Sequence, residues 1–314
     1  MNYPYANGII KTLENNILDK SKLIRVAHDS PQAMYKELKE MGYGDNEAYD
    51  LESLIVSEFT KLQALFNEIA PKQEPLALLF LSDDAINIKG LLKQKLYNYS
   101  FAPNYNSNGL FKVDELKNLI FASTPLSNKK YHKFLAPLLK LDKEELNSRA
   151  LSAKVDNLLY NLAFSLLKSS ENQAMYIYFE NKIDFTNLIS FIRARKLGWD
   201  VDEFLLMSII GGKISVDLLK NLYSLEDKKF LYGLKDYELG KLSSDLSFIL
   251  ERNDLGLLEI YFENRLLQKA KESFADPFTI GPLLYYGLLK KAEAQNIRTI
   301  ASNPHFDANH LLDY

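Results

Sequence analysis

The stretch that decides the fold reads Asp184-Phe-Thr-Asn187-Leu188-Ile-Ser-Phe191-Ile192-Arg193-Ala-Arg195. A similar stretch begins 100 residues earlier and reads Asp84-Ala-Ile-Asn87-Ile88-Lys-Gly-Leu91-Leu92-Lys93-Gln-Lys95. A third begins 109 residues later and reads Glu293-Ala-Gln-Asn296-Ile297-Arg298-Thr-Ile300-Ala301. From Glu293 to the end of the chain, and on from its start to Asp84, is a further 105 residues. Three nearly equal spacings indicate three similar units that close on themselves.

A second pattern follows each copy and supports this register. Val113-Asp114-Glu-Leu116-Lys117-Asn118-Leu119 follows the first copy, and Val216-Asp217-Leu-Leu219-Lys220-Asn221-Leu222 follows the second at an offset of 103 residues. A weaker version, Leu18-Asp19-Lys-Ser-Lys22-Leu-Ile24, lies where the third copy needs it. A further match pairs Leu38-Lys39 before Gly44 with Leu234-Lys235 before Gly240. The sequence therefore predicts repeat units over residues 84–183, residues 184–292, and residues 293–314 together with 1–83.

Composition limits the classes of protein that this chain can be. At 314 residues, with 47% hydrophobic and 25% charged residues, it is long enough for two or three subdomains and too apolar for extended disorder. A net charge of −3 argues against a nucleic-acid partner. No apolar run approaches the roughly 20 residues that span a bilayer, and no signal peptide is evident. We therefore expect a soluble chain without direct insertion into a bilayer.

The sequence carries no recognisable catalytic or cofactor motif. Cysteine is absent, so thiol chemistry and cysteine zinc sites are excluded. Gly211-Gly212-Lys213 resembles a phosphate-binding loop, but Met207 and Ile214 stand where that motif needs glycine and Ser or Thr. His305, Asp307 and His310 are more typical of a solvated tail than of a metal site. We expect no enzyme activity, no cofactor and no metal.

Apolar spacings of three and four residues predict helices nearly throughout, and therefore an all-α protein. Loops are expected at 102–109, at 123–128 and at Gly211-Gly212, and Gly198 is expected to end a helix. Pro75 and Pro282 are expected in first helical turns, each opening a run that leads into a motif copy. Asp is a good N-cap, but long helices that pass through the motif are favoured over capping.

On such a helix the motif acid lies within the apolar stripe and the Asn at its edge. A buried carboxylate needs a cation or a hydrogen-bond donor. Lys95 and Arg195 return to the same side of the helix about 16 Å further along, so they are expected to reach a neighbouring unit. One interpretation is a set of ion pairs between units that closes the ring; the other is a polar lining that holds a partner. The candidate positions are Asp84, Asn87, Asp184, Asn187, Arg193, Arg195, Glu293, Asn296 and Arg298.

Three segments resemble the C subunit of V-type and archaeal-type rotary ATPases, whose eukaryotic counterpart is called d. The most specific is Pro277-Phe278-Thr-Ile280-Gly-Pro-Leu-Leu-Tyr-Tyr286, with Lys290 and Glu293-Ala-Gln-Asn296-Ile-Arg298 after it. The others are Asp184-x-x-Asn187-Leu188 with Arg193, and Met34-Tyr-Lys-Glu-Leu38 to Tyr43-Gly44. The resemblance covers essentially the full length. In the third copy Ser302 and Pro304 replace the basic pair, which puts a strict threefold role for those basic residues in doubt.

The resemblance implies three helical domains about a pseudo-threefold axis, forming a funnel or socket. It implies a non-catalytic adaptor of a V-type ATPase or ATP synthase, coupling the central-stalk subunits (D and F type) to the membrane rotor ring for hydrogen ion transport or ATP synthesis. Such an adaptor is peripheral, on the cytoplasmic face of the membrane. The alternative is a free-standing helical-repeat scaffold that binds proteins, although an open array normally carries polar capping repeats at its ends.

Overall fold

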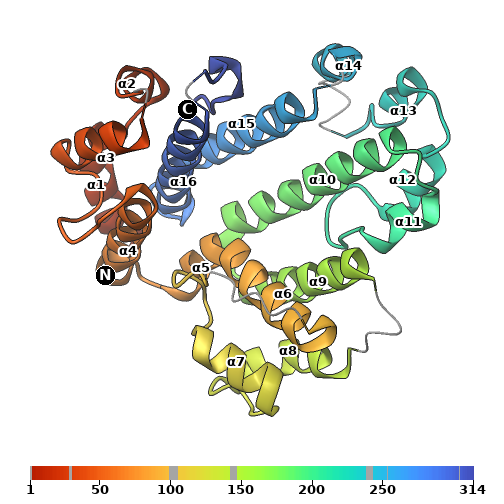
Figure 1. Ribbon diagram of the computed structural model, residues 1–314, viewed down its shortest axis with the longest axis horizontal. Coiled ribbons are helices and arrows are strands. Elements are labelled where there is room, and N and C mark those ends of the chain that lie inside the picture. Colours follow the sequence, from red (N-terminus) through yellow and green to blue (C-terminus); the bar gives the residue numbers. More distant parts are fainter. Residues whose placement is uncertain are drawn as a thin grey trace. The chain divides into compact units, whose positions relative to one another are not determined.

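The described residues of the chain are all-helical in their regular structure. The structure is a computed structural model that describes residues 2–27, 30–98, 105–141, 147–237, 243–252, 254–303 and 305–314. Within these ranges the chain forms α-helices and short 3-10 helices and no strand (Figure 1). The all-α prediction is therefore confirmed. Gly240 and Pro304, which support the repeat pattern in the sequence, lie outside the described residues, as do residues 102–104 of the first predicted loop.

The chain divides into two compact units. Unit 1 comprises Met1–Leu79, Ser169–Tyr178 and Glu259–Tyr314, and unit 2 comprises Phe80–Lys168 and Phe179–Leu258. Two of the divisions between the units fall within helices, α10 (Gln173–Lys196) and α15 (Leu255–Ser273). The three repeat units predicted from the sequence remain a prediction.

In unit 1, helix α16 is the central element and packs against α1, α2, α3 and α4 (Figure 1). Its residues from Gly281 to Lys290 are all buried, because this stretch is apolar around most of its circumference. The helices of unit 1 are α1 (Tyr3–Leu13), α2 (Lys20–Arg25), α3 (Pro31–Glu40), α4 (Leu51–Ile69), α5 (Glu74–Ala77), the greater part of α15 (Leu255–Ser273), and α16 (Gly281–Ser302).

In unit 2, α6 packs against α7 and α9, and an aromatic cluster fills the region around α10 to α13. Phe191 stacks on Phe230 with ring centroids 4.6 Å apart, and Phe204 stacks on Tyr223 at 5.6 Å. The helices of unit 2 are α6 (Leu81–Tyr97), α7 (Val113–Ala122), α8 (Lys129–Leu135), α9 (Ser148–Leu166), the greater part of α10 (Gln173–Lys196), α11 (Val201–Leu206), α12 (Val216–Leu222), α13 (Asp227–Gly233) and α14 (Ser243–Arg252).

Local sequence signals explain several boundaries. Gly198, two residues beyond the last residue of α10, has φ +69°, as a C-terminal glycine should, and Pro282 lies in the first turn of α16. Residues 123–128 and Gly211-Gly212 are non-helical, as predicted. Pro75 also opens a helix, but α5 ends at Ala77 and the 3-10 turn Leu78–Phe80 separates it from α6. The run from Pro75 therefore reaches the motif as two α-helices joined by a 3-10 turn, not as the one long helix that the sequence favours.

None of the three motif acids is an N-cap. Asp184 and Glu293 lie in the interior of α10 and α16, as predicted. Asp84 lies in the first turn of α6, whose N-cap is Phe80. The side chains of these acids are therefore available for contacts outside their own helices.

Candidate functional site

Asp84 and Asn87 of α6 hold the loop that leads to α7. The carboxylate of Asp84 accepts the backbone N–H groups of Leu110 at 2.8 Å and Phe111 at 3.1 Å. The amide of Asn87 donates to the carbonyl of Asn106 at 2.8 Å and accepts the N–H of the same residue at 3.0 Å. We call such an arrangement, a helix acid and an Asn three residues on that bind the backbone of a loop, a loop clasp.

Asp184 and Asn187 of α10 form a second loop clasp with the same pattern. Asp184 accepts the N–H groups of Lys213 at 3.2 Å and Ile214 at 2.9 Å. Asn187 donates to the carbonyl of Ile209 at 2.7 Å and accepts its N–H at 2.8 Å. The glycine-rich stretch before Ile214, which resembles a phosphate-binding loop in sequence, is therefore a segment bound by a carboxylate.

Glu293 and Asn296 of α16 form a third loop clasp, whose loop comes from both ends of the chain. Glu293 accepts the N–H of Leu18. Asn296 donates to the carbonyl of Leu312 at 2.9 Å and accepts its N–H at 2.7 Å. The hydroxyl of Tyr314 donates to the carbonyl of Leu18 at 2.7 Å, so the two terminal segments also contact each other.

For the third copy, the clasps give an alignment that differs by two residues from the one read in the sequence. Helices α7, α12 and α2 each begin two residues after the clasped Phe111, Ile214 and Leu18. Lys20, rather than Leu18, is thus equivalent to the first residue of α7 and α12. In this register a fully buried leucine occupies the fourth position of each helix, namely Leu116, Leu219 and Leu23. This shared buried position supports the corrected alignment.

Burial dominates the electrostatics of the two aspartates. Burial raises the pKa of Asp84 to about 7, although its two N–H donors act in the opposite direction. Burial likewise raises the pKa of Asp184 to about 6, against the N–H groups of Ile214 and Lys213 and the Lys213 ammonium. Both carboxyl groups therefore titrate close to neutral pH.

The basic residues at the far ends of these helices bind within their own part of the chain. The Lys95 ammonium donates to the carbonyl of Ile120 at 2.6 Å. Arg195 donates to the carbonyl of Leu225 at 2.6 Å and lies 3.2 Å from a carboxylate oxygen of Asp227. The expectation that Lys95 and Arg195 reach a neighbouring repeat unit is therefore wrong. They bind the end of the helix that follows their own loop clasp, or the turn just after it.

Two further predicted positions are exposed. Arg193 lies exposed near the end of α10. Arg298 of α16 is exposed and forms a two-pronged ion pair with Glu52 of α4, through its Nε at 3.0 Å and a terminal nitrogen. Such a surface pair contributes little to stability, about 0–1 kcal/mol.

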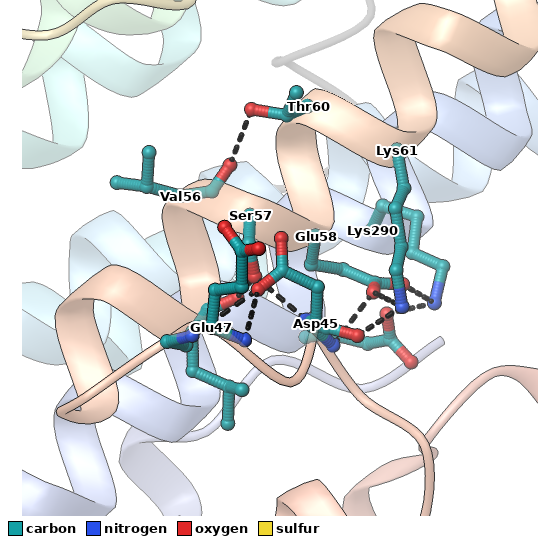
Figure 2. Close-up of polar contacts among 12 residues, drawn as sticks. Asp45, Glu47, Val56, Ser57, Glu58, Thr60, Lys61 and Lys290 are labelled. Carbon is teal, nitrogen blue, oxygen red and sulfur yellow. Dashed lines mark hydrogen bonds and ion pairs between the residues drawn. The ribbon is translucent and has the colours of Figure 1, made fainter.

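The third loop clasp differs from the others because a buried ion cluster adjoins it. The Lys290 ammonium lies 2.8 Å from Glu293 and 2.9 Å from Glu58 of α4. Figure 2 shows Glu58 and Lys290 turned toward each other, with Lys61 beside them. Glu58 also accepts the N–H of Gly44 at 2.9 Å, and Lys61 donates to the carbonyl of Gly44. The cluster therefore joins α4, α16 and the loop before α4.

Burial and the neighbouring charges set the pKa values of the residues in the cluster. Burial raises the pKa of Glu293 to about 7, outweighing the Lys290 ammonium and the Leu18 N–H. Burial lowers the pKa of Lys290, but the carboxylates of Glu293 and Glu58 more than compensate and raise it above its ordinary value. Lys290 therefore stays charged. The cluster holds two carboxyl groups, Glu58 and Glu293, for this one buried ammonium, so its acids outnumber its buried cation by one.

With this geometry in place, the comparison with known families is decisive. The sequence model of the family described as ATP synthase (C/AC39) subunit matches residues 6–303. The chain belongs to this family. Relatives named as the C subunit of A-type ATP synthase are 22% identical in Pyrococcus furiosus and 26% identical in Desulfurococcus sp.. A third, from Methanosarcina barkeri, is 24% identical; the matches cover 95% of this chain and 85–88% of the relatives.

Among its described residues, this C/AC39 family member carries neither a metal-binding cluster nor a membrane-spanning helix. In the part of the chain that the structure describes, no group of three or more His, Cys, Asp or Glu is placed to hold a metal ion. Across the same residues, no helix combines the length and apolarity needed to cross a membrane. The polar residues that the structure does bring together act on backbone groups and on each other.

Sequence reasoning missed the partners of the motif acids in this C/AC39 chain. It did not identify Glu58, nor the glycines Gly109 and Gly212 that lie against the aspartates. A signal for the glycines was present, because Gly109-Leu110-Phe111 and Gly212-Lys213-Ile214 share a glycine two residues before the clasped apolar residue. Nothing comparable marks Glu58, whose partner Lys290 is 232 residues away in the sequence.

Proposed function

We propose that this chain is a non-catalytic adaptor of a rotary A-type or V-type ATPase or ATP synthase, coupling the central stalk to the membrane rotor ring. The observation that carries the proposal is the family match over residues 6–303, together with relatives named as the C subunit of A-type ATP synthase. The central-stalk subunits (D and F type) and the rotor ring are the proposed partners. The cytoplasmic face of the membrane is the proposed location.

The three loop clasps support an adaptor role on physical grounds. A part that passes torque has to keep its loops in place under load, and close packing with satisfied buried polar groups resists deformation. Each loop clasp fixes a loop to a long helix by hydrogen bonds between buried groups. We also propose a pseudo-threefold arrangement of the repeat units, for which the equivalent contacts of the three clasps are the support.

The candidate residues then divide into two roles. We propose that Asp84, Asn87, Asp184, Asn187, Glu293 and Asn296 shape the loops, since all six are buried. The exposed Arg193 and Arg298 are proposed to contribute directly to a partner surface. Arg195 is half-buried and binds the Leu225 carbonyl and the Asp227 carboxylate, so we assign it to the first role, that of shaping a loop.

The test is affinity purification of the tagged chain from mildly solubilised native membranes, followed by mass spectrometry. Recovery of central-stalk and rotor-ring subunits is expected, and reconstitution without the chain should lose ion pumping coupled to ATP hydrolysis. Arg298→Ala is the informative variant, because its surface position leaves the fold intact while a contact is removed. The double exchange Glu52→Arg with Arg298→Glu is its matched control for the internal pair. Recovery of unrelated soluble proteins alone would favour a protein-binding scaffold instead.

A further inference from the structure

Leu18 is held from both sides by residues from the far end of the chain. Its N–H is bound by Glu293 and its carbonyl by the hydroxyl of Tyr314, 2.7 Å away. The segment that carries Tyr314 is itself fixed by Asn296, which forms both backbone hydrogen bonds of Leu312. We call Leu18, Glu293, Asn296, Leu312 and Tyr314 the terminal joint. Its two sides are far apart in the sequence and are joined by these side-chain hydrogen bonds.

The ion cluster beneath the terminal joint has two carboxylates for one buried ammonium. The exposed fractions of the side chains are 11% for Glu58, 7% for Lys290 and 0% for Glu293. Lys61 approaches Glu58 only to 3.9 Å, and half of its side chain is exposed, so water screens its charge. A buried cluster with one excess negative charge is unfavourable, and taking up a proton relieves it.

The surroundings offer no second cation at the same depth among the described residues. Tyr43 lies under the Lys290 ammonium, 5.6 Å from ring centroid to nitrogen. The ammonium of Lys39 on α3 is bound instead by the carbonyls of Asn46 and Ala48. Other titratable or charged groups around the joint are Tyr286 on α16, Tyr314, Asp19 before α2, Lys22 of α2, which binds the Ile17 carbonyl at 2.9 Å, and Arg298 with Glu52 at the surface.

We propose that the terminal joint is a proton-operated latch, in which uptake of one proton by Glu293 removes the excess charge and stabilises the closed joint around Leu18. The proton binds the Glu293 oxygen that faces Lys290, so that ion pair is lost, while the other oxygen still accepts the Leu18 N–H as a weaker, uncharged acceptor. Lys290 keeps its charge and stays paired with Glu58. Loss of the proton as pH rises restores the buried excess charge and loosens the joint.

The direction of the pH effect follows from the shift at Glu293. Its pKa is raised from 4.5 to about 7 in the folded chain, so the folded state binds the proton more tightly than the unfolded state does. The latch is therefore tightest below the ordinary pKa, and its stability is lost as pH rises through about 7. Opening of the joint should become more frequent by up to about tenfold per pH unit within that window.

Two measurements on the full chain test the latch directly. Carbon-13 labelling of glutamate carboxyl groups allows the Glu293 signal, assigned by its loss in Glu293→Gln, to be titrated by NMR. Hydrogen exchange of the Leu18 amide, corrected for its intrinsic pH dependence, reports opening. We expect a Glu293 midpoint well above 4.5 and protection of Leu18 that falls as pH rises from about 5 to about 8. A Glu293 midpoint near its ordinary value, or pH-independent protection of Leu18, overturns the proposal.

Matched variants separate the latch from general destabilisation. Glu293→Gln is isosteric, keeps an acceptor for Leu18, and should give protection that is high and constant with pH. Glu58→Gln leaves a balanced pair of Lys290 and Glu293, so the Glu293 midpoint should fall, while the larger contribution of burial remains. An unchanged midpoint in Glu58→Gln shows that excess charge is not the cause. Neither readout depends on assembly with a partner, so the proposed function is tested separately.

Discussion

Gly109 lies so close to Asp84 that a methyl group on its Cα would be 2.1 Å from Oδ1 of the carboxylate. Gly212 stands in the same relation to Asp184, also at 2.1 Å. Heavy atoms that are not bonded do not approach to this distance, so the carboxylate occupies the space of a side chain. Glycine is required here for close approach of the backbone, because it has no Cβ.

Gly212→Ala is expected to destabilise the chain by about 1–3 kcal/mol, because the added methyl group displaces the Asp184 carboxylate from its two N–H donors. Denaturant unfolding at pH 7 measures the change. Gly8→Ala is the matched control, since nothing lies within 4 Å of a Cβ in the middle of α1. That change should stabilise the chain by about 0.5–1 kcal/mol. Equal effects at the two glycines would contradict the close-approach argument.

Asn187→Ala is expected to cost about 2–4 kcal/mol, because the buried N–H and carbonyl of Ile209 both lose their partner. Asn187→Asp should cost at least as much, since its buried carboxylate would face the Ile209 carbonyl without a cation. Thermal or urea unfolding gives the changes, and Asn221→Ala on the exposed face of α12 is the control with a change below about 0.5 kcal/mol. Losses at Asn187 no larger than at Asn221 would contradict the loop clasp.

The stability of the chain should fall as pH rises from about 5 to about 8. Asp84, Asp184 and Glu293 have pKa values raised to about 7, 6 and 7, so the folded state binds more protons than the unfolded state in this window. Stability is then greatest below the ordinary pKa values and is lost as pH rises through the raised ones, by about 1.4 kcal/mol for each tenfold difference in proton affinity between the two states. Urea unfolding at several pH values tests this. Asp84→Asn should flatten the profile, and a stability that rises with pH would refute the assignment.

Lys290→Met should be among the most destabilising single changes in unit 1. It leaves the buried carboxylates of Glu58 and Glu293 without their cation, which costs about 3–5 kcal/mol. The loss should be larger at pH 8 than at pH 6, because protonation of Glu293 partly relieves it. Arg298 lies on the same helix as Lys290, and Arg298→Ala breaks its exposed ion pair with Glu52. This change should alter stability by less than about 1 kcal/mol. Similar losses for both variants would argue against a buried cluster.

The fold class and the positions of the motif residues could be predicted because they depend on local patterns. Apolar spacing indicated the helices, and the angular position of Asp184 and Glu293 on those helices placed them in buried stripes. What a buried carboxylate binds depends on the segment that the tertiary fold brings to it. Asp184 and Ile214 are 30 residues apart, while Glu293 and Leu18 are 275 apart, and neither spacing leaves a periodic signal.

The error over Lys95 and Arg195 has a physical origin. Their distance along the helix suggested a contact beyond their own repeat unit, but each long side chain reaches a carbonyl near the end of the short helix that follows its loop clasp. The two-residue misalignment of Leu18 with Val113 arose in a similar way. The aspartate at position 19 caps α2, whereas the aspartate at position 114 lies within α7, so matching the two acids led to the wrong register.

The division of the terminal joint between the two ends of the chain sets the order in which a nascent chain can fold. Unit 2 is complete once synthesis has passed Leu258, so it is free to form while the remainder is still being made. The early residues up to Leu79 wait for α16 and for the segment that ends at Tyr314 before Leu18 has its partners. Until then their apolar surfaces remain open to chaperones. A chain that terminates prematurely near position 290 should therefore leave the residues up to Leu79 unfolded, while unit 2 still folds.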